Sequence, residues 1–171
     1  MTDAYKRKSH EHLTDLAGEY RWGDAGQFFL LIIFIIGMII DLFYLKILNY
    51  WQDIFIWYYR FIVFIILFFI ACYFSQKAHQ KIFDEERKKL TVIKTDIYGK
   101  IRHPMYFGFI LLFLSFVILS FSLIALVIFV IIVIFYYYLC RYEEKILIDK
   151  LGEDYRDYMK KVPMLFPKIR I

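Results

Sequence analysis

The chain has 171 residues, of which 61% are hydrophobic and 22% aromatic, and its formal net charge is +5. Its apolar residues gather in long runs, and most lysines and arginines lie between these runs, a pattern typical of a protein that spans a bilayer. The positive charge indicates contact with anionic lipid headgroups and not with nucleic acid, because no nucleic-acid-binding motif accompanies it. Both cysteines, Cys72 and Cys140, lie inside apolar runs, which argues against a secreted disulfide framework.

The N-terminal half contains a polar segment followed by two apolar runs. Residues 1–26 form the polar segment, in which apolar residues at helical spacing between positions 13 and 22 are consistent with a short interfacial helix or with a solvated tail. The runs at 27–45 and 54–75 are close to the roughly 20 residues needed to cross about 30 Å of hydrocarbon. We predict one transmembrane helix in each run, so that residues 27–75 form the first pair of spans.

The longest apolar run, residues 105–140, contains no charged residue. As a single helix it would extend about 54 Å, nearly twice the hydrocarbon thickness. We therefore predict a turn at residues 119–122, where Ser120 and Ser122 interrupt the apolar sequence. The predicted fold is an all-α integral membrane bundle of about four transmembrane helices, in which the last two form a hairpin within a C-terminal region, residues 76–171.

The distribution of basic residues predicts the orientation of the bundle. Four lysines and arginines lie in residues 1–26, eight in 76–104 and eight in 141–171, whereas Lys46 alone lies in the connection between the first two runs. The basic side of a membrane protein faces the cytoplasm. We therefore predict a multi-pass protein with both termini and the central loop in the cytoplasm.

Two charged residues, Asp41 and Arg60, fall within apolar runs at similar predicted depths near the outer side. A charge inside a span is a functional hypothesis by default. A structural ion pair between the two, or snorkelling to the outer interface, is the simpler interpretation.

The most informative residues stand at the two ends of the predicted hairpin. Arg102, His103 and Tyr106 precede or begin its first helix, and Glu143 and Glu144 follow its second. A helical hairpin brings its two ends together, so we expect these five side chains to form one site at the cytoplasmic boundary. Each residue alone also has an ordinary explanation, such as a headgroup contact or a solvated helix face.

The chemistry of this expected site suits a ligand with charges of both signs. Pro104 is well placed in a first helical turn, and we expect the free N–H groups there, with Arg102 and His103, to form a positive, donor-rich mouth. Glu143 and Glu144 would meet a cationic group, and Gly152 would terminate the helix that carries them. S-adenosylmethionine has an ammonium, a carboxylate, an adenosine and a sulfonium centre, and it fits that description.

The ordered set of motifs resembles a known family. An RHPxYxG entry, a charge-free hairpin, a Glu-Glu pair and LGxxYxxYxxxVPxxxP resemble the C-terminal signature of the isoprenylcysteine carboxyl methyltransferase family, which includes related phospholipid methyltransferases. The resemblance covers roughly residues 90–168. It implies an S-adenosylmethionine pocket at the cytoplasmic membrane boundary, a lipophilic acceptor that enters sideways from the membrane lipids, and no metal.

The resemblance also implies roles for individual residues. The expected cofactor contacts are Thr91, Val92, Ile93, Tyr98, His103, Pro104, Met105, Tyr106 and Glu143. The expected lid over the adenosine consists of Tyr155, Val162, Pro163, Phe166 and Pro167. The chain departs from the family pattern at Asp96, where Gly is usual, and at Leu139, where the prenylcysteine enzymes have an Arg that assists catalysis; Arg141 follows on a different helix face.

The resemblance leaves the methyl acceptor open. A prenylcysteine-type carboxylate, the first expectation, is already ionised and would be held by Arg102 or Arg141. An amine headgroup, as in a phospholipid N-methyltransferase, must lose a proton, and Glu144 or His103 would accept it. The expected catalytic residues are therefore Arg102, Arg141 and Glu144. A non-enzymatic membrane adaptor that has kept the fold is the alternative from another class, and a sterol reductase would need a larger helical body.

Overall fold

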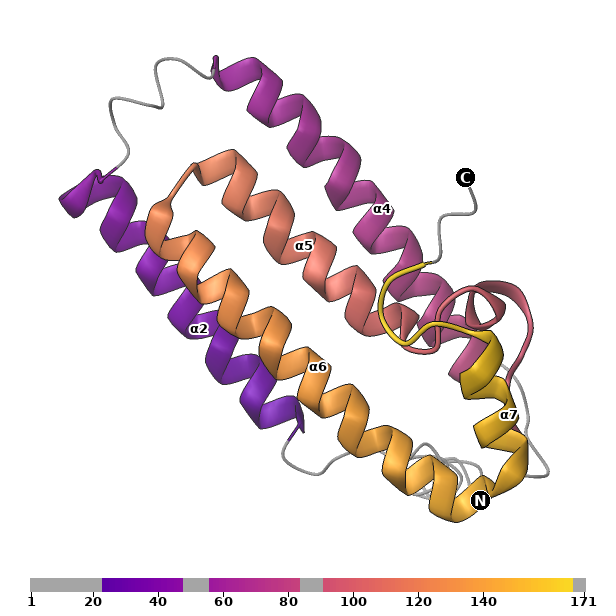
Figure 1. The fold of residues 1–171 in the computed structure, drawn as a ribbon. Helices are drawn as coiled ribbons and strands as arrows, with labels where there is room; N and C mark the ends of the chain where they lie inside the picture. The colour runs from indigo at the N-terminus through magenta and orange to yellow at the C-terminus, as the bar shows by residue number, and fades with distance from the viewer. Residues whose placement is uncertain (1–22, 48–55, 84–90, 168–171) are drawn as a thin grey trace, which may run out of the picture.

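The computed structural model describes residues 23–47, 56–83 and 91–167 and shows four long helices side by side (Figure 1). The interfacial helix considered for residues 13–22 lies outside the described residues. The elements are α2 (Gly23–Ile40), the π-helical turn η1 (Asp41–Leu45), α4 (Trp57–Phe83), the 3-10 turn η2 (Asp96–Gly99), α5 (Pro104–Ser120), α6 (Leu123–Leu151) and α7 (Glu153–Lys161). No strand occurs in these three described segments, which confirms the all-α prediction.

The helices have the length and composition of membrane spans. Within residues 23–47, 56–83 and 91–167, three are long and apolar enough to cross a bilayer, over Gly23–Leu45, Trp57–Lys81 and Leu123–Leu151. The fourth, α5, is apolar but has only 17 residues, or about 26 Å of helix. It packs beside α4 and α6 in the interior of the bundle, while α2 packs on α6 (Figure 1).

Two helices continue well past the ends of their apolar runs. The predicted second span ends at residue 75, but α4 extends to Phe83. The helix α6 likewise continues to Leu151, where Gly152 at φ 60° terminates it, as predicted. Hydropathy marks where a helix leaves lipid, whereas helix propensity and backbone hydrogen bonding decide where it ends, so the two boundaries differ.

The hairpin turn lies where the serines predicted it. The helix α5 ends at Ser120, and Phe121 adopts a left-handed conformation with φ 52°. The side chain of Ser122 then caps α6 by accepting a hydrogen bond from the backbone N–H of Ala125 at 3.1 Å. This cap satisfies one of the N–H groups that a helix start leaves open.

The expected ion pair between Asp41 and Arg60 does not form in the described part of the chain. The buried carboxylate of Asp41 accepts hydrogen bonds from the Ser122 hydroxyl and from the backbone N–H groups of Ile124, at 3.3 Å, and Ile47, at 3.2 Å. The Arg60 guanidinium lies instead 5.8 Å from the centre of the Phe121 ring. Both charges contact the hairpin tip, because the start of α6 offers Asp41 unpaired N–H donors and Phe121 offers Arg60 an aromatic face.

Close packing of α4 against α5 depends on a glycine. A Cβ at Gly108 would lie 3.0 Å from the backbone oxygen of Ala71 and would also meet the Ser75 hydroxyl. Only hydrogen fits at this contact. The first turns of α5 are therefore held directly against α4, and the start of α5 carries the residues of the expected site.

Candidate active site

The two ends of the hairpin meet in a compact group of five side chains, here named the carboxylate cluster: Arg102, His103, Tyr106, Glu143 and Glu144. The Tyr106 hydroxyl donates a hydrogen bond to Oε1 of Glu143. The His103 ring lies between the carboxylates, with Nδ1 3.5 Å from Glu143 and Nε2 3.4 Å from Glu144. Nε of Arg102 is 2.9 Å from Oε1 of Glu144. The predicted adjacency of residues about forty positions apart is therefore confirmed.

The carboxylate cluster is almost completely buried. His103 and Glu143 are each 8% exposed, and Glu144 is 2% exposed. Within the described chain, no hydrogen bond reaches Nε of Arg102, Nε2 of His103 or either carboxylate oxygen of Glu144. The short contacts of Glu144 are thus electrostatic and poorly aligned for hydrogen bonding. Three of these atoms have an ion-pair contact but no aligned hydrogen bond, and Oε2 of Glu144 has neither. Buried polar atoms that lack hydrogen bonds are costly, so the cluster suits a ligand that offers both donors and acceptors.

The charge of His103 follows from its neighbours. Burial lowers the pKa of the imidazole, but its interactions with Cys140, Glu143 and Glu144 outweigh burial and hold that pKa well above its usual value. The raised pKa favours the protonated ring, which carries one N–H near Glu143 and one near Glu144. As a cation it offsets one of the two adjacent carboxylates.

The C-terminal segment forms hydrogen bonds with the residues just before α5. The backbone N–H of Arg102 donates to the carbonyl of Pro163 at 2.9 Å, and that of His103 donates to Met164 at 3.1 Å. The Tyr158 hydroxyl donates to the carbonyl of Tyr98. The returning chain thus accepts the two backbone N–H groups that precede α5, which are distinct from the first-turn N–H groups that we expect to be free.

The expected lid divides into a buried and an exposed part. Tyr155, Tyr158 and Val162 form a buried cluster against which Val92 also packs, and Leu165 enters the main core. By contrast, Pro167 is exposed and Phe166 is 56% exposed, with its ring 6.1 Å from that of Phe107. Residues 155–165 thus pack against the body of the protein, and residues 166 and 167 extend over its surface.

The loop before α5 supports the cluster indirectly. Thr91 is exposed, whereas Ile93 and Met105 pack on a small core formed by Ala78, Ile97 and Tyr98. Pro104 is the first residue of α5, as predicted, and is buried. Of the nine expected cofactor contacts, the structure brings only His103, Tyr106 and Glu143 together in the carboxylate cluster.

The conformation of Asp96 explains the departure from glycine at this position. Its φ is 54°, in the left-handed region where glycine is favoured and aspartate is among the better-tolerated residues. The side chain reaches Lys81 on α4, with Oδ2 3.2 Å from Nζ. The substitution thus preserves the turn and adds a contact to α4.

Arg141 does not join the carboxylate cluster. It is exposed and lines a surface groove with Lys145 and three tyrosines, Tyr137, Tyr138 and Tyr142. Leu139, at the position of the Arg in the prenylcysteine enzymes, is 5% exposed. A catalytic role for Arg141 would therefore require a different arrangement of α6.

Two residues that contact the cluster were not predicted from the sequence. The ring of Tyr136 stacks on Tyr106 with centres 5.2 Å apart, and Cys140, which is fully buried, interacts with His103. Positions 136, 140 and 143 share one face of a helix. This spacing could have identified Tyr136 and Cys140, but both residues lie within an unbroken apolar run, where nothing distinguishes them from membrane-facing positions.

Comparison with known proteins agrees with the geometry. A family model described as phospholipid methyltransferase matches residues 58–154, more than half of the chain. Two methanethiol S-methyltransferases are similar: one from Pseudomonas deceptionensis is 35% identical over 75 residues, 43% of this chain and 28% of that protein. One from Pseudomonas sp. strain GM41 is 37% identical over 82 residues, 42% of this chain and 27% of that protein.

These alignments span less than a third of the length of either relative. No solved structure is significantly similar to this chain. The family match covers α4, the loop, the whole hairpin and the carboxylate cluster. The chain belongs to the phospholipid methyltransferase family of integral membrane proteins.

Proposed function

We propose that the protein is a membrane methyltransferase that binds S-adenosylmethionine at the carboxylate cluster. The observation that carries the proposal is the set of buried polar atoms without hydrogen bonds on Arg102, His103 and Glu144. They comprise both donors and acceptors within one group of contacting side chains. An adaptor that had merely kept the fold would gain nothing from burying them.

The residues present fit this cofactor. S-adenosylmethionine supplies a methyl group activated by a sulfonium. Glu144 would accept hydrogen bonds from a cationic or hydroxyl group, and Arg102 and protonated His103 would donate to a carboxylate. Glu143 is held by Tyr106 and His103 and would fix the position of the imidazole. The apolar helices around the cluster would exclude water from the reaction.

We further propose that the acceptor is a nucleophile that must lose a proton, such as a thiol or an amine. A carboxylate acceptor would need a further cation to hold it, but in this proposal Arg102 serves Glu144 and the carboxylate of the cofactor, and Arg141 lies on the exposed face of α6. Glu144 has two oxygens without hydrogen bonds and would accept the proton. The two relatives are named for methyl transfer to the sulfur of a thiol, which is an acceptor of this kind.

The proposed orientation places the cluster at the cytoplasmic side. Both ends of the hairpin meet there, and the flanking segments carry most of the lysines and arginines of the chain. The cofactor would then arrive from the cytoplasm, and the acceptor would reach the site from the bilayer or from water.

The proposal is tested by calorimetric titration of the detergent-purified protein with S-adenosylmethionine. We expect saturable binding, weakened by at least about tenfold in Glu144→Gln, because the neutral amide loses charge-assisted hydrogen bonds. Asp149→Asn, the same change at an exposed position of the same helix, is the matched control and should bind as the unaltered protein does. Absence of binding, or equal effects of the two substitutions, would refute the site.

The acceptor is tested separately with cofactor labelled in the methyl group. Methanethiol, phosphatidylethanolamine and a prenylcysteine are presented in parallel, and the labelled product identifies the reaction. We expect label on the thiol or the amine. Label on the prenylcysteine alone would overturn the proposed acceptor class while leaving the cofactor site intact.

A further inference from the structure

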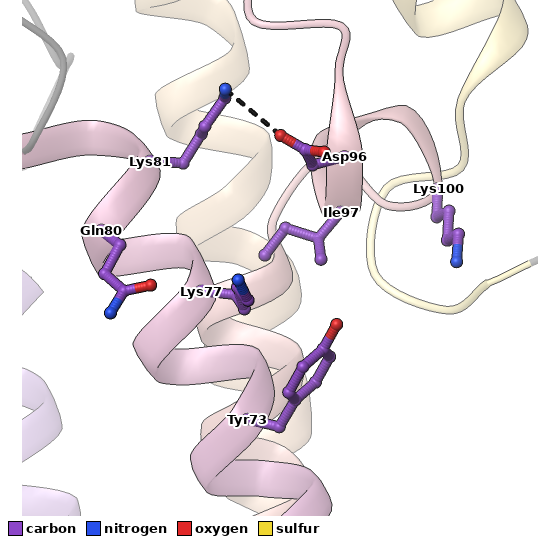
Figure 2. Close-up of a pocket in the computed structure, with 7 residues that line it drawn as sticks. All are labelled: Tyr73, Lys77, Gln80, Lys81, Asp96, Ile97 and Lys100. Atoms are coloured by element: carbon purple, nitrogen blue, oxygen red, sulfur yellow. Dashed lines mark ion pairs between the residues drawn. The ribbon is translucent and has the colours of Figure 1, made fainter.

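A second site lies between the end of α4 and the η2 turn (Figure 2). It is a cavity of about 470 Å³, within the range of about 300–1,000 Å³ typical of small-molecule sites. It shares no lining residue with the carboxylate cluster. Its walls include Tyr73, Lys77, Lys81, Asp96, Ile97 and Lys100.

The described lining of the cavity carries an excess of positive charge. It includes three lysines, Lys77, Lys81 and Lys100, and a single carboxylate, that of Asp96 (Figure 2). Asp96 pairs with Lys81 at 3.2 Å, the dashed contact in Figure 2. The ammonium groups of Lys77 and Lys100 form no ion pair with any described residue, and both side chains are exposed. These two ammonium groups, one on α4 and one just after η2, are thus available to bind an anion.

The position of the cavity along α4 favours an amphiphilic ligand. Tyr73, Lys77 and Lys81 follow one another at intervals of four residues and share one helix face. The apolar run of α4 ends at residue 75, so Lys77 and Lys81 lie just beyond it, where the helix leaves the hydrocarbon. The same exposed face continues into the membrane through Ile66 and Phe69, which are 54% and 65% exposed. Polar and apolar binding surfaces are therefore continuous.

We propose that this cavity binds the phosphate group of an anionic membrane phospholipid. Lys77 and Lys100 hold the phosphate from opposite walls, while Tyr73 and Ile97 contact the glycerol region. The acyl chains lie along the exposed apolar face of α4. A cationic headgroup such as choline finds no open carboxylate in the described lining, because Asp96 is occupied by Lys81.

Native mass spectrometry of the full chain in detergent tests the site, with phosphatidylglycerol as the probe. We expect Lys77→Gln/Lys100→Gln to weaken phosphatidylglycerol binding by at least about tenfold, given the attraction of each lysine for anionic lipid. Lys145→Gln/Lys161→Gln removes the same charge from exposed positions outside the cavity and is the matched control. A similar loss in both double variants would mean a diffuse electrostatic effect and would overturn the proposal.

Further measurements identify the source of the phosphate. Phosphatidylcholine should bind at least several-fold more weakly than phosphatidylglycerol, and equal binding would refute the anionic selectivity. Inorganic phosphate is titrated as a competitor; if it binds as tightly as the lipid, the site belongs to a soluble anion and the lipid assignment fails. Binding of S-adenosylmethionine to Lys77→Gln/Lys100→Gln should be unchanged, which separates this site from the proposed active site and shows that the variant is folded.

Discussion

Arg102 and Glu144 approach to 2.9 Å, between Nε and Oε1, with their side chains 9% and 2% exposed. One residue precedes the first helix of the hairpin and the other lies in the second helix, beyond the apolar run. Their contact therefore depends on the whole hairpin. It also brings opposite charges into a buried environment, where the loss of one partner leaves the other uncompensated.

A double-mutant cycle measures the interaction energy between Arg102 and Glu144. We expect Glu144→Gln to lower the free energy of unfolding by roughly 3 kcal/mol, because it leaves the Arg102 guanidinium buried without its counter-charge. Arg102→Gln should lower the free energy of unfolding much less in the Glu144→Gln variant than in the unaltered protein, giving a coupling energy of about 1 kcal/mol or more. Unfolding in mixed detergent micelles provides the measurement. Additive effects would show that the pair contributes nothing to stability.

The raised pKa of His103 predicts a specific dependence of stability on pH. The pKa of His103 is higher in the folded state than in the unfolded state, where it is about 6.5, so protonation of the imidazole stabilises the fold. This stabilisation is complete at pH values below about 6.5 and is lost as the pH rises through the folded-state pKa. His103→Gln should therefore destabilise most near pH 6 and progressively less in alkaline solution. Melting temperatures of both proteins across this range test it. A difference that is constant or grows with pH contradicts the protonated imidazole.

Asp41 should matter for the tip of the hairpin rather than for catalysis. Asp41→Ala removes the acceptor of the Ser122 hydroxyl and of two backbone N–H groups, so we expect a loss of about 1–3 kcal/mol in unfolding free energy. Asp24→Ala, at an exposed position near the start of α2, is the control and should cost less than about 1 kcal/mol. Binding of S-adenosylmethionine should change little in either variant that remains folded.

Gly108 predicts a difference between two glycine substitutions. A Cβ at Gly108 would crowd the backbone of Ala71, which cannot rotate away, so Gly108→Ala should cost about 1–3 kcal/mol and displace α5 from α4. A Cβ at Gly37 would meet only the methyl ends of Ile128 and Ile124, at 2.6 and 2.9 Å. Gly37→Ala should therefore be the milder change, as comparison of their thermal unfolding will show. The reverse order would contradict the close approach of α4 and α5.

Much of the architecture followed from the length and charge of the apolar runs. A segment without charge from residue 105 to 140 is too long for one crossing, and Ser120 and Ser122 indicated where it turns. The same hairpin predicts that His103 lies beside Glu143, and the structure confirms it. The family motifs then gave those residues a chemical meaning. These inferences succeeded because the bilayer imposes one length scale on every helix.

Tertiary structure alone decided which partners the polar groups found. No pattern in the chain showed that Asp41 would bind the hairpin tip instead of Arg60, or that Pro163 and Met164 would accept the N–H groups at the start of α5. The lack of hydrogen bonds at Glu144 and the lysine-lined cavity beside η2 also depend on helix rotation and loop packing. Hydrophobic length determines how many times a chain crosses a membrane, but a hydrogen bond or an ion pair depends on ångström-scale positions that only the packed helices establish.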